Sequence, residues 1–260
     1  MRRRRWVWVG AVVFLLVSLM ASQSFSLNQE GTVVVLEPAP VTDPAGPGFC
    51  PLPARGQSSI PLDFQPPQEV RPAHPSNYGQ RQMLDAFGRP VVQSPIVVLH
   101  ETVGTADNAL NLFEVDHTGN DNAQVSYHAI IRLDGTVVYI VPPTMRAFGA
   151  SPSQFRGQAV RTNPRGYASV NNFAYHISLE TPEDGRNNAN FHSGYTAAQY
   201  QSLVWLVAQT CIPLERITTH RAVDTSGSRK DPRSFDWARF NDDYLRYPKR
   251  RTLYFGLGEA

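Results

Sequence analysis

Two histidines close short apolar segments of the sequence, and a polar loop follows each of them. His100 ends PIVVLH, and His220 ends RITTH. If both segments are strands of one sheet, the histidines lie at strand ends, where α/β proteins gather their ligands. Neutral imidazole is a frequent ligand of Zn²⁺, and a catalytic zinc site keeps three protein ligands. Asp231, eleven positions after His220, is the predicted third ligand, and Asp224 is the alternative.

Three further side chains have the chemistry that a hydrolytic site needs. Lys230 directly precedes Asp231, and its ammonium group could stabilise an oxyanion. Glu180 ends the segment FAYHISLE, where a carboxylate could orient or deprotonate water. Tyr127, in VSYHAII, could hydrogen-bond the substrate or this water. Each also has a simpler interpretation, namely a solvated turn for Lys230, an exposed turn residue for Glu180 and a packed aromatic for Tyr127. His176, within FAYHISLE, has no predicted role.

The elements that must position these residues follow from hydrophobic patterns. Apolar, β-branched runs predict strands, and Asp134-Gly135 predicts a hairpin turn. Thr196 and Gln199 form a capping-box pair at the start of the clearest helix. The predicted strands are 95–100, the two arms of 124–141, 173–180 and 216–220, and the predicted helices are 105–115, 196–211 and 234–247. Strands and helices are interspersed, so we predict an α/β fold with a mixed central sheet flanked by helices.

The N-terminus has the pattern of an export signal. Four arginines, residues 2–5, precede the uncharged run WVWVGAVVFLLVSLMA and the small residues of ASQS. This order predicts a signal peptide or signal anchor over residues 1–26. The rest of the chain is then exported to the periplasm or cell envelope, in contact with a membrane only if the segment stays attached. Without these arginines the formal net charge of +2 becomes −2, so no basic face for nucleic acid is predicted.

Proline-rich composition separates the N-terminal part from the predicted catalytic part. Residues 27–93 predict a linker or wrapping arm, with one short strand expected at 32–37. Residues 94–247 form the predicted zinc domain, and residues 248–260 form a tail. Cys50 and Cys211 suit an exported protein, where disulfides persist. They either form a bridge that pins the arm to the domain or remain two separate buried thiols.

Several separated segments resemble, in the same order, the zinc-dependent N-acetylmuramoyl-L-alanine amidases of the type-2 amidase family, which are related to peptidoglycan recognition proteins. The segments are IVVLHET, SYHAIIRLDGTVVYIVP, RAFGA, NNFAYHISLE and ITTHRAV…RKDP. The resemblance covers about residues 90 to 245. It implies that His100, His220 and Asp231 bind zinc, and that the fold is the mixed sheet predicted above.

The resemblance also implies roles for the other candidates. Glu180 matches the family's catalytic glutamate, Lys230 matches its oxyanion-stabilising lysine, and Tyr127 matches a tyrosine that some branches use instead of glutamate. The chain departs from the family in four places, one of which is a slightly longer loop after His220. Lys230 touches Asp231 where the family has Lys-x-Asp, RAFGA lacks the family's histidine, and His176 stands where small or aliphatic residues are usual.

The implied activity is zinc-dependent hydrolysis of the amide bond between N-acetylmuramic acid and L-alanine, in peptidoglycan or in muropeptides. The main alternative is a non-catalytic module that binds peptidoglycan without cutting it, because fold alone does not decide activity. A third hypothesis is a zinc hydrolase that acts on another amide. A complete set of three metal ligands favours an enzyme over a recognition module.

Overall fold

A computed structural model describes residues 50, 53–54 and 56–257. The predicted signal segment, the predicted strand at 32–37 and the end of the tail lie outside these residues. No helix within the described part of the chain is long and apolar enough to cross a membrane.

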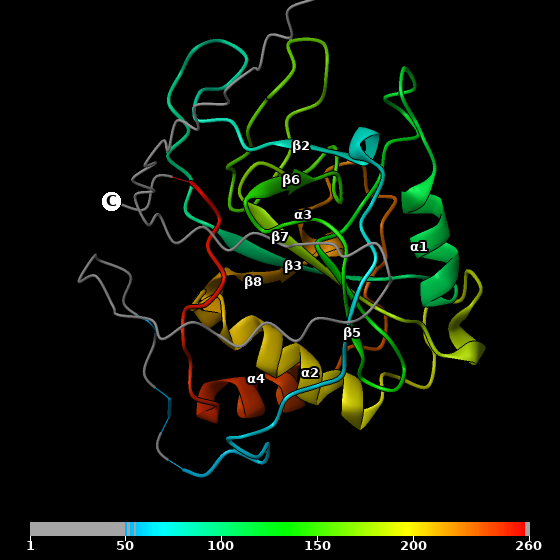
Figure 1. Cartoon of the computed structure of the whole chain (residues 1–260), viewed down its shortest axis with the longest axis vertical. Coiled ribbons are helices and arrows are strands. Elements are labelled where there is room, and N and C mark those ends of the chain that lie inside the picture. Colours follow the sequence, from blue (N-terminus) through cyan, green and yellow to red (C-terminus); the bar gives the residue numbers. More distant parts are fainter. Residues whose placement is uncertain (1–49, 51–52, 55, 258–260) are drawn as a thin grey trace, which may run out of the picture. The chain divides into compact units, whose positions relative to one another are not determined.

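A six-stranded mixed sheet forms the centre of the described domain, in the order β1-β5-β4-β7-β3-β8. Among these strands, Figure 1 labels β5, β7, β3 and β8. The strands are β1 (Gln68–Val70), β3 (Ile96–Glu101), β4 (Ala129–Ile131), β5 (Val137–Tyr139), β7 (Ala174–Leu179) and β8 (Ile217–Thr219). β3 pairs in parallel with β7 and β8, whereas β4 and β5 form the antiparallel hairpin predicted at Asp134-Gly135. The predicted mixed α/β sheet is confirmed.

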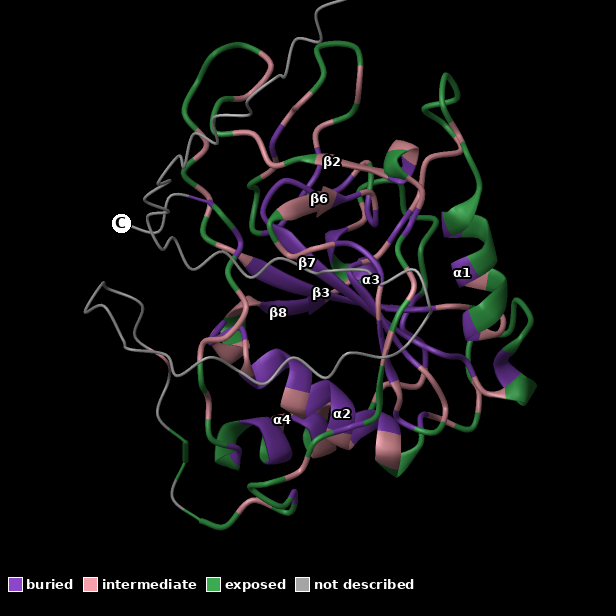
Figure 2. Ribbon diagram, in the orientation of Figure 1, coloured by how far each residue is buried: buried purple, intermediate pink, exposed green. Residues whose placement is uncertain are grey.

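β3 and β7, which pair with each other, are the longest strands of the sheet, and every residue in both is buried (Figure 2). Strands covered on both faces are expected to be continuously apolar. Both strands break this rule with histidines and other polar residues: His100 and Glu101 in β3, and His176 and Ser178 in β7. Buried polar groups need partners, so these four residues mark the part of the sheet where chemistry is to be sought.

Helices cover both faces of the sheet. α2 (Ala197–Ala208) and α4 (Trp237–Arg246) pack against one face, where their apolar side chains join those of β3 and β7 in the larger core. α1 (Ala106–Glu114) covers the other face, packed on Ile130 and Val138. The predicted capping box of Thr196 and Gln199 is present at the start of α2. Thr105 caps α1, because its hydroxyl accepts from the backbone N–H of Asn108. Another α-helix, α3 (His220–Val223), is a single turn after β8.

The described part of the proline-rich segment contributes to the sheets, which its composition did not predict. β1 pairs in parallel with β5 as an edge strand. β2 (Tyr78–Gln80) pairs with β6 (Met145–Ala147) in a separate two-stranded sheet. Ile60, in the same segment, is 1% exposed and belongs to the larger core. Strands of three residues at a sheet edge tolerate nearby prolines, which explains why they carry no clear pattern.

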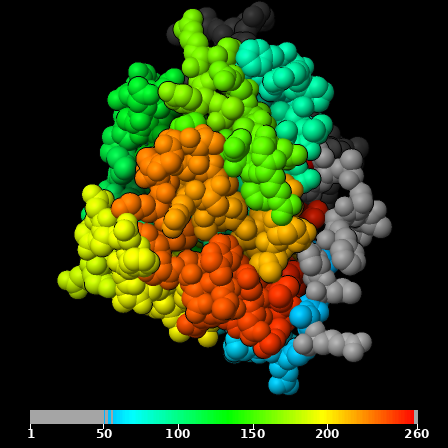
Figure 3. Space-filling view, turned by 180° about the vertical axis from the view of Figure 1, so that it is seen from behind, coloured from blue at the N-terminus to red at the C-terminus, as the bar shows by residue number. Residues whose placement is uncertain are grey.

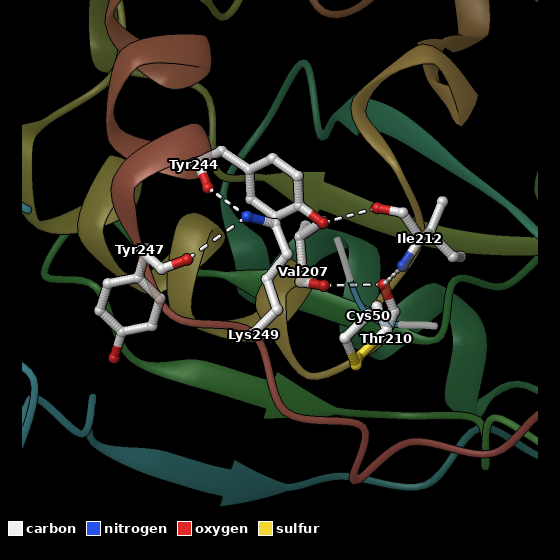
Figure 4. The surroundings of a disulfide bond; sticks show 8 residues. Cys50, Val207, Thr210, Ile212, Tyr244, Tyr247 and Lys249 are labelled. Atoms are coloured by element: carbon white, nitrogen blue, oxygen red, sulfur yellow. Dashed lines mark hydrogen bonds between the residues drawn. A yellow bond between two sulfur atoms is a disulfide. The ribbon is translucent and has the colours of Figure 1, made fainter. Parts of the chain in front are cut away.

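Cys50 and Cys211 form a disulfide, with their Cα atoms 4.8 Å apart (Figure 4). The alternative of two separate thiols is therefore wrong. Cys211 follows the end of α2, where Thr210 accepts a hydrogen bond from the backbone of Ile212. The hydroxyl of Tyr244, in α4, donates to the carbonyl oxygen of Ile212. The bridge thus attaches Cys50, in the proline-rich segment, to the region where the end of α2 contacts α4.

Candidate metal centre

β3 and β8 deliver two histidines to one end of the sheet. His100 lies near the end of β3, and His220 follows β8 as the first residue of α3. Because these parallel strands are neighbours, their carboxyl ends lie side by side. Asp231 is brought to the same place by its loop, whose carbonyl oxygen at Asp231 accepts a 2.9 Å hydrogen bond from the backbone N–H of Arg221 in α3.

The three predicted metal ligands converge. Oδ2 of Asp231 lies 3.1 Å from Nδ1 of His220 and 3.3 Å from Nδ1 of His100. All three residues are buried, and their potential ligand atoms lie within 4.8 Å of one another. The alternative third ligand, Asp224, is engaged elsewhere, because its carboxylate accepts from the backbone N–H groups of Ser226 and Ser228.

The group has the chemistry of a metal site rather than that of a structural cluster. Nδ1 of His100 is fully buried and makes no hydrogen bond of acceptable geometry, which is costly unless its lone pair has another partner. Burial lowers the pKa of His100 to about 4, so the ring is neutral near pH 7 and able to bind a cation. Two imidazoles and one carboxylate are a donor set that suits Zn²⁺ and leaves one coordination position open.

Asp231 is ionised despite its burial. Burial acts to raise the pKa of its carboxyl group, but the neighbouring imidazoles of His100 and His220 outweigh this effect and lower the pKa below its ordinary value. The carboxylate therefore supplies a negative charge between two neutral rings. Such a charge attracts a divalent cation and balances half of the cation's charge.

Tyr127 forms one wall of this site. Its ring stacks on that of His100, with centroids 4.4 Å apart and an interplanar angle of 29°, and meets Phe113 of α1 edge to face. Burial raises the pKa of the Tyr127 hydroxyl well above its ordinary value. The side chain is therefore a neutral hydrogen-bond donor beside the first ligand, not a base in its present surroundings.

Glu180 and Lys230 do not hydrogen-bond to the three ligands. Oε2 of Glu180 accepts from the backbone N–H of Leu133 at 3.1 Å, and Oε1 lies 3.7 Å from the guanidinium of Arg186. The ammonium of Lys230 donates to Oδ1 of Asn190 at 2.9 Å and to the carbonyl oxygen of Asn188. Both side chains are therefore held by other partners.

Two other residues lie closer to the centre than the sequence indicated. Nδ1 of His176 is 2.9 Å from Nε2 of His100, on the side of the ring away from Asp231. Ser178 pairs with His100 across β3 and β7 and is also buried. The sequence did contain a sign that His176 and Ser178 belong together with Glu180, because alternate residues of the predicted strand FAYHISLE lie on one face of the sheet. What the sequence lacked was the register that places this face beside His100.

A third residue, Arg229, was also missed. Its exposed guanidinium makes no hydrogen bond or ion pair within the described residues. Burial dominates the pKa shifts of His100 and Tyr127, and the charge of Arg229 adds a lowering effect at both. Arg229 stands two positions before Asp231, which is the spacing that puts side chains on the same side of an extended segment.

A basic cleft of about 580 Å³ adjoins the loop of Asp231. Its walls come from the segments 221–235 and 190–191, coloured orange and yellow in Figure 3, where the two lie side by side. The cationic lining residues are Arg221, Arg229, Lys230 and Arg233. Of these, Arg233 is buried and paired with Glu101, so the others supply the cleft's free positive charge. A substrate that carries carboxylates beside the scissile bond suits this lining.

We expect the metal-free protein to lose stability as the pH falls from about 7 to about 4. Burial lowers the pKa of His100 to about 4 and holds those of His128 and His176 well below their ordinary value. Unfolded histidines titrate near pH 6.5, so they take up protons that the folded protein excludes. Stability is then fully present above this pH and is lost below it, by roughly 4 kcal/mol per pH unit for three such groups.

Urea unfolding in the presence of a chelator, repeated at several pH values, measures this dependence. A free energy of unfolding that stays constant between about pH 7 and pH 5 would contradict the burial of three neutral histidines.

A family model described as N-acetylmuramoyl-L-alanine amidase matches residues 90–234. The 1,6-anhydro-N-acetylmuramyl-L-alanine amidase AmpD of Escherichia coli strain K12 is 35% identical over 123 residues, which span 45% of this chain and 57% of that protein. AmpD of Citrobacter freundii is 30% identical over 126 residues, 47% of this chain and 58% of that protein. The chain thus spans little more than half the length of these relatives.

Among solved structures, a selenomethionine derivative of AmpD aligns with 25% identity and a TM-score of 0.48, covering 70% of this chain and 97% of its own. The Drosophila peptidoglycan recognition protein SD aligns with 15% identity and a TM-score of 0.43, covering 72% of this chain and 99% of its own.

Proposed function

The chain belongs to the N-acetylmuramoyl-L-alanine amidase family, whose model matches residues 90–234, and from this we propose that it hydrolyses the amide bond between N-acetylmuramic acid and L-alanine with a bound zinc ion. The substrate is peptidoglycan or a muropeptide released from it. The observation that carries the proposal is the buried group of His100, His220 and Asp231, with Nδ1 of His100 left without a hydrogen bond. A module that only binds peptidoglycan has no need of this costly arrangement.

When bound, zinc supplies a Lewis acid that polarises the amide carbonyl and acidifies a water molecule. The chain's own residues then orient the reactants. Tyr127, stacked on His100 and kept neutral, donates a hydrogen bond to the substrate or to the water. Glu180 is the proposed base. To reach the water it must exchange its contact with the backbone of Leu133 for one in the cleft. Basic side chains of the cleft hold the anionic stem peptide.

We expect Arg229 to matter more than Lys230 in stabilising the oxyanion. The guanidinium of Arg229 has no hydrogen-bond partner within the described residues, whereas the ammonium of Lys230 is held by Asn188 and Asn190. Arg229→Ala should lower kcat by about 100-fold, the loss typical of an oxyanion donor. Lys230→Ala should lower it by less than about threefold. Steady-state kinetics on a soluble muropeptide measures both, and the reverse order would return the role to Lys230.

The proposed compartment is the periplasm or the cell envelope, where the substrate lies. The basic and apolar N-terminus supports export. The disulfide between Cys50 and Cys211 also supports it, because such bonds persist outside the reducing cytoplasm. Fractionation of cells that express the tagged chain tests this proposal, and recovery of the protein from the cytoplasm with reduced thiols would contradict it.

The deciding experiment is to measure bound zinc in the purified chain and to digest purified murein with and without a chelator. Mass spectrometry then detects the free stem peptides. We expect one zinc per chain and chelator-sensitive release of peptides that begin with L-alanine. Binding of murein without any release, after zinc is restored, would favour the recognition module. Release of other peptides would favour a different amide as substrate.

A further inference from the structure

A second imidazole lies directly behind the first metal ligand. His100 and His176 stand on neighbouring parallel strands, β3 and β7, and both are fully buried. Nε2 of His100 and Nδ1 of His176 are 2.9 Å apart, which is a hydrogen bond. Histidine ligands of metals usually give their second nitrogen to a carboxylate or a carbonyl oxygen, which fixes the orientation of the ring. Here a neutral histidine holds that position.

The positions of the ring nitrogens determine where the protons lie. Nδ1 of His100 lies 3.3 Å from Oδ2 of Asp231, so it is the ring nitrogen placed to offer a lone pair to a metal held by the three residues. A neutral imidazole carries one proton, which must then be on Nε2 of His100. That proton is donated to Nδ1 of His176, so His176 carries its own proton on Nε2. A single hydrogen bond therefore selects the tautomer of both rings.

The surroundings of His176 keep its ring in place. Its backbone N–H donates a 2.9 Å hydrogen bond to Nδ1 of His128. The rings of His176 and His128 also stack, at an interplanar angle of 9°. On another side, Gly149 approaches so closely that a Cβ atom there would lie 2.6 Å from the His176 ring. Only glycine permits this approach, so the chain forms a cradle that fits an imidazole at position 176.

Packing alone does not explain a histidine at this position. Nε2 of His176 is buried and has no hydrogen-bond partner in the described residues, and such an atom destabilises a fold. An aliphatic side chain would fill the space without this penalty. The ring atom of His176 that does form a hydrogen bond is Nδ1, and its partner is His100, the predicted metal ligand. The energetic cost of leaving Nε2 of His176 without a partner is therefore explained by the hydrogen bond that Nδ1 of the same ring makes with His100.

We propose that His176 is a positioning residue that holds His100 in the tautomer and orientation needed to bind the metal. This inference rests on the proposed zinc site, but it concerns the residue behind that site and the reason for its chemistry. His176 touches neither the substrate nor the metal in this role. Its loss weakens metal binding, and activity falls only as a consequence.

The test compares two variants in the full chain. His176→Leu keeps much of the volume but has no acceptor, whereas His176→Asn places an amide oxygen near the position of Nδ1. Competition with a chromogenic chelator measures the zinc dissociation constant of each protein. We expect His176→Leu to bind zinc about 10 to 100 times more weakly, and His176→Asn to stay within about threefold of the wild type. Equal affinity of His176→Leu and the wild type, or an equal loss in both variants, would overturn the proposal.

A second measurement needs no substitution, so it holds even if a variant fails to fold. Two-dimensional ¹⁵N–¹H spectra that report histidine ring protons reveal the tautomer of His100 in the metal-free wild type. A proton on Nε2 supports the inference, and a proton on Nδ1 refutes it. Zinc binding by the wild type separates the two proposals. If it binds zinc but the tautomer is wrong, only the role of His176 fails, whereas absence of zinc binding removes the metal site itself.

Discussion

Asp231→Asn should abolish zinc binding and amide hydrolysis together. The substitution keeps the size of the side chain but removes the negative charge that lies between His100 and His220. Without this charge the remaining two neutral ligands do not hold the cation. We expect the zinc content to fall from one ion per chain to nearly none. The rate of amide hydrolysis should fall by roughly a thousandfold or more, since the metal supplies several kcal/mol of transition-state stabilisation.

Asp224→Asn provides the matched control. Asp224 belongs to the same loop and is the same type of residue, but its carboxylate accepts hydrogen bonds from the backbone of its own turn. We expect this variant to keep its zinc and most of its activity. Elemental analysis measures the zinc content of both variants, and a murein digestion assay measures their activity. Together they show whether Asp231 or Asp224 is the third ligand. Zinc lost from Asp224→Asn and retained by Asp231→Asn would make Asp224 the third ligand.

Strand ends explain why the ligand group was accessible to sequence reasoning. His100 and His220 each close a β-branched run, and strands of this kind pair in parallel next to one another with their ends aligned. Asp231 follows His220 by only eleven residues, and this short connection limits how far its carboxylate can lie from the His220 ring. The central strands, the hairpin and the capped helices were predictable for a similar reason, because each depends on a pattern within a few consecutive residues.

The surroundings of the ligands depend on relations that a local pattern does not contain. The contact between His176 and His100 requires the register of two strands that are more than seventy residues apart in sequence. The direction of Lys230 depends on the path of the 188–190 loop, which supplies its partners. β1 is three residues long, so its place at the sheet edge is set by the pairing with β5 and not by its own composition. Local patterns thus predicted that His100, His220 and Asp231 would lie together, but not the contacts that surround them.

Arg233→Ala should destabilise the fold more than the removal of any surface ion pair. Arg233 and Glu101 form a buried ion pair, and the guanidinium also donates to the carbonyl oxygens of Gly185, Asn187 and Ala189. The substitution leaves the carboxylate of Glu101 buried without its cation. Breaking such a pair from one side costs roughly 3–5 kcal/mol. Urea unfolding of the zinc-bound proteins measures the difference in the free energy of unfolding.

Arg89→Ala is the control for this prediction, because Arg89 pairs with Asp85 at the surface with 71% of its side chain exposed. Arg89→Ala should lower the free energy of unfolding by less than about 1 kcal/mol.

The double variant Arg233→Met/Glu101→Gln separates the effect of the lost charge pairing from the effect of the lost packing. If the penalty of Arg233→Ala comes from the unpaired carboxylate, the double variant recovers part of the stability. No recovery would assign the effect to the three carbonyl contacts of the 185–189 loop. Glu101 directly follows His100 on β3, so their side chains lie on opposite faces of the strand. Recovery and no recovery each identify what stabilises the face of β3 opposite to His100.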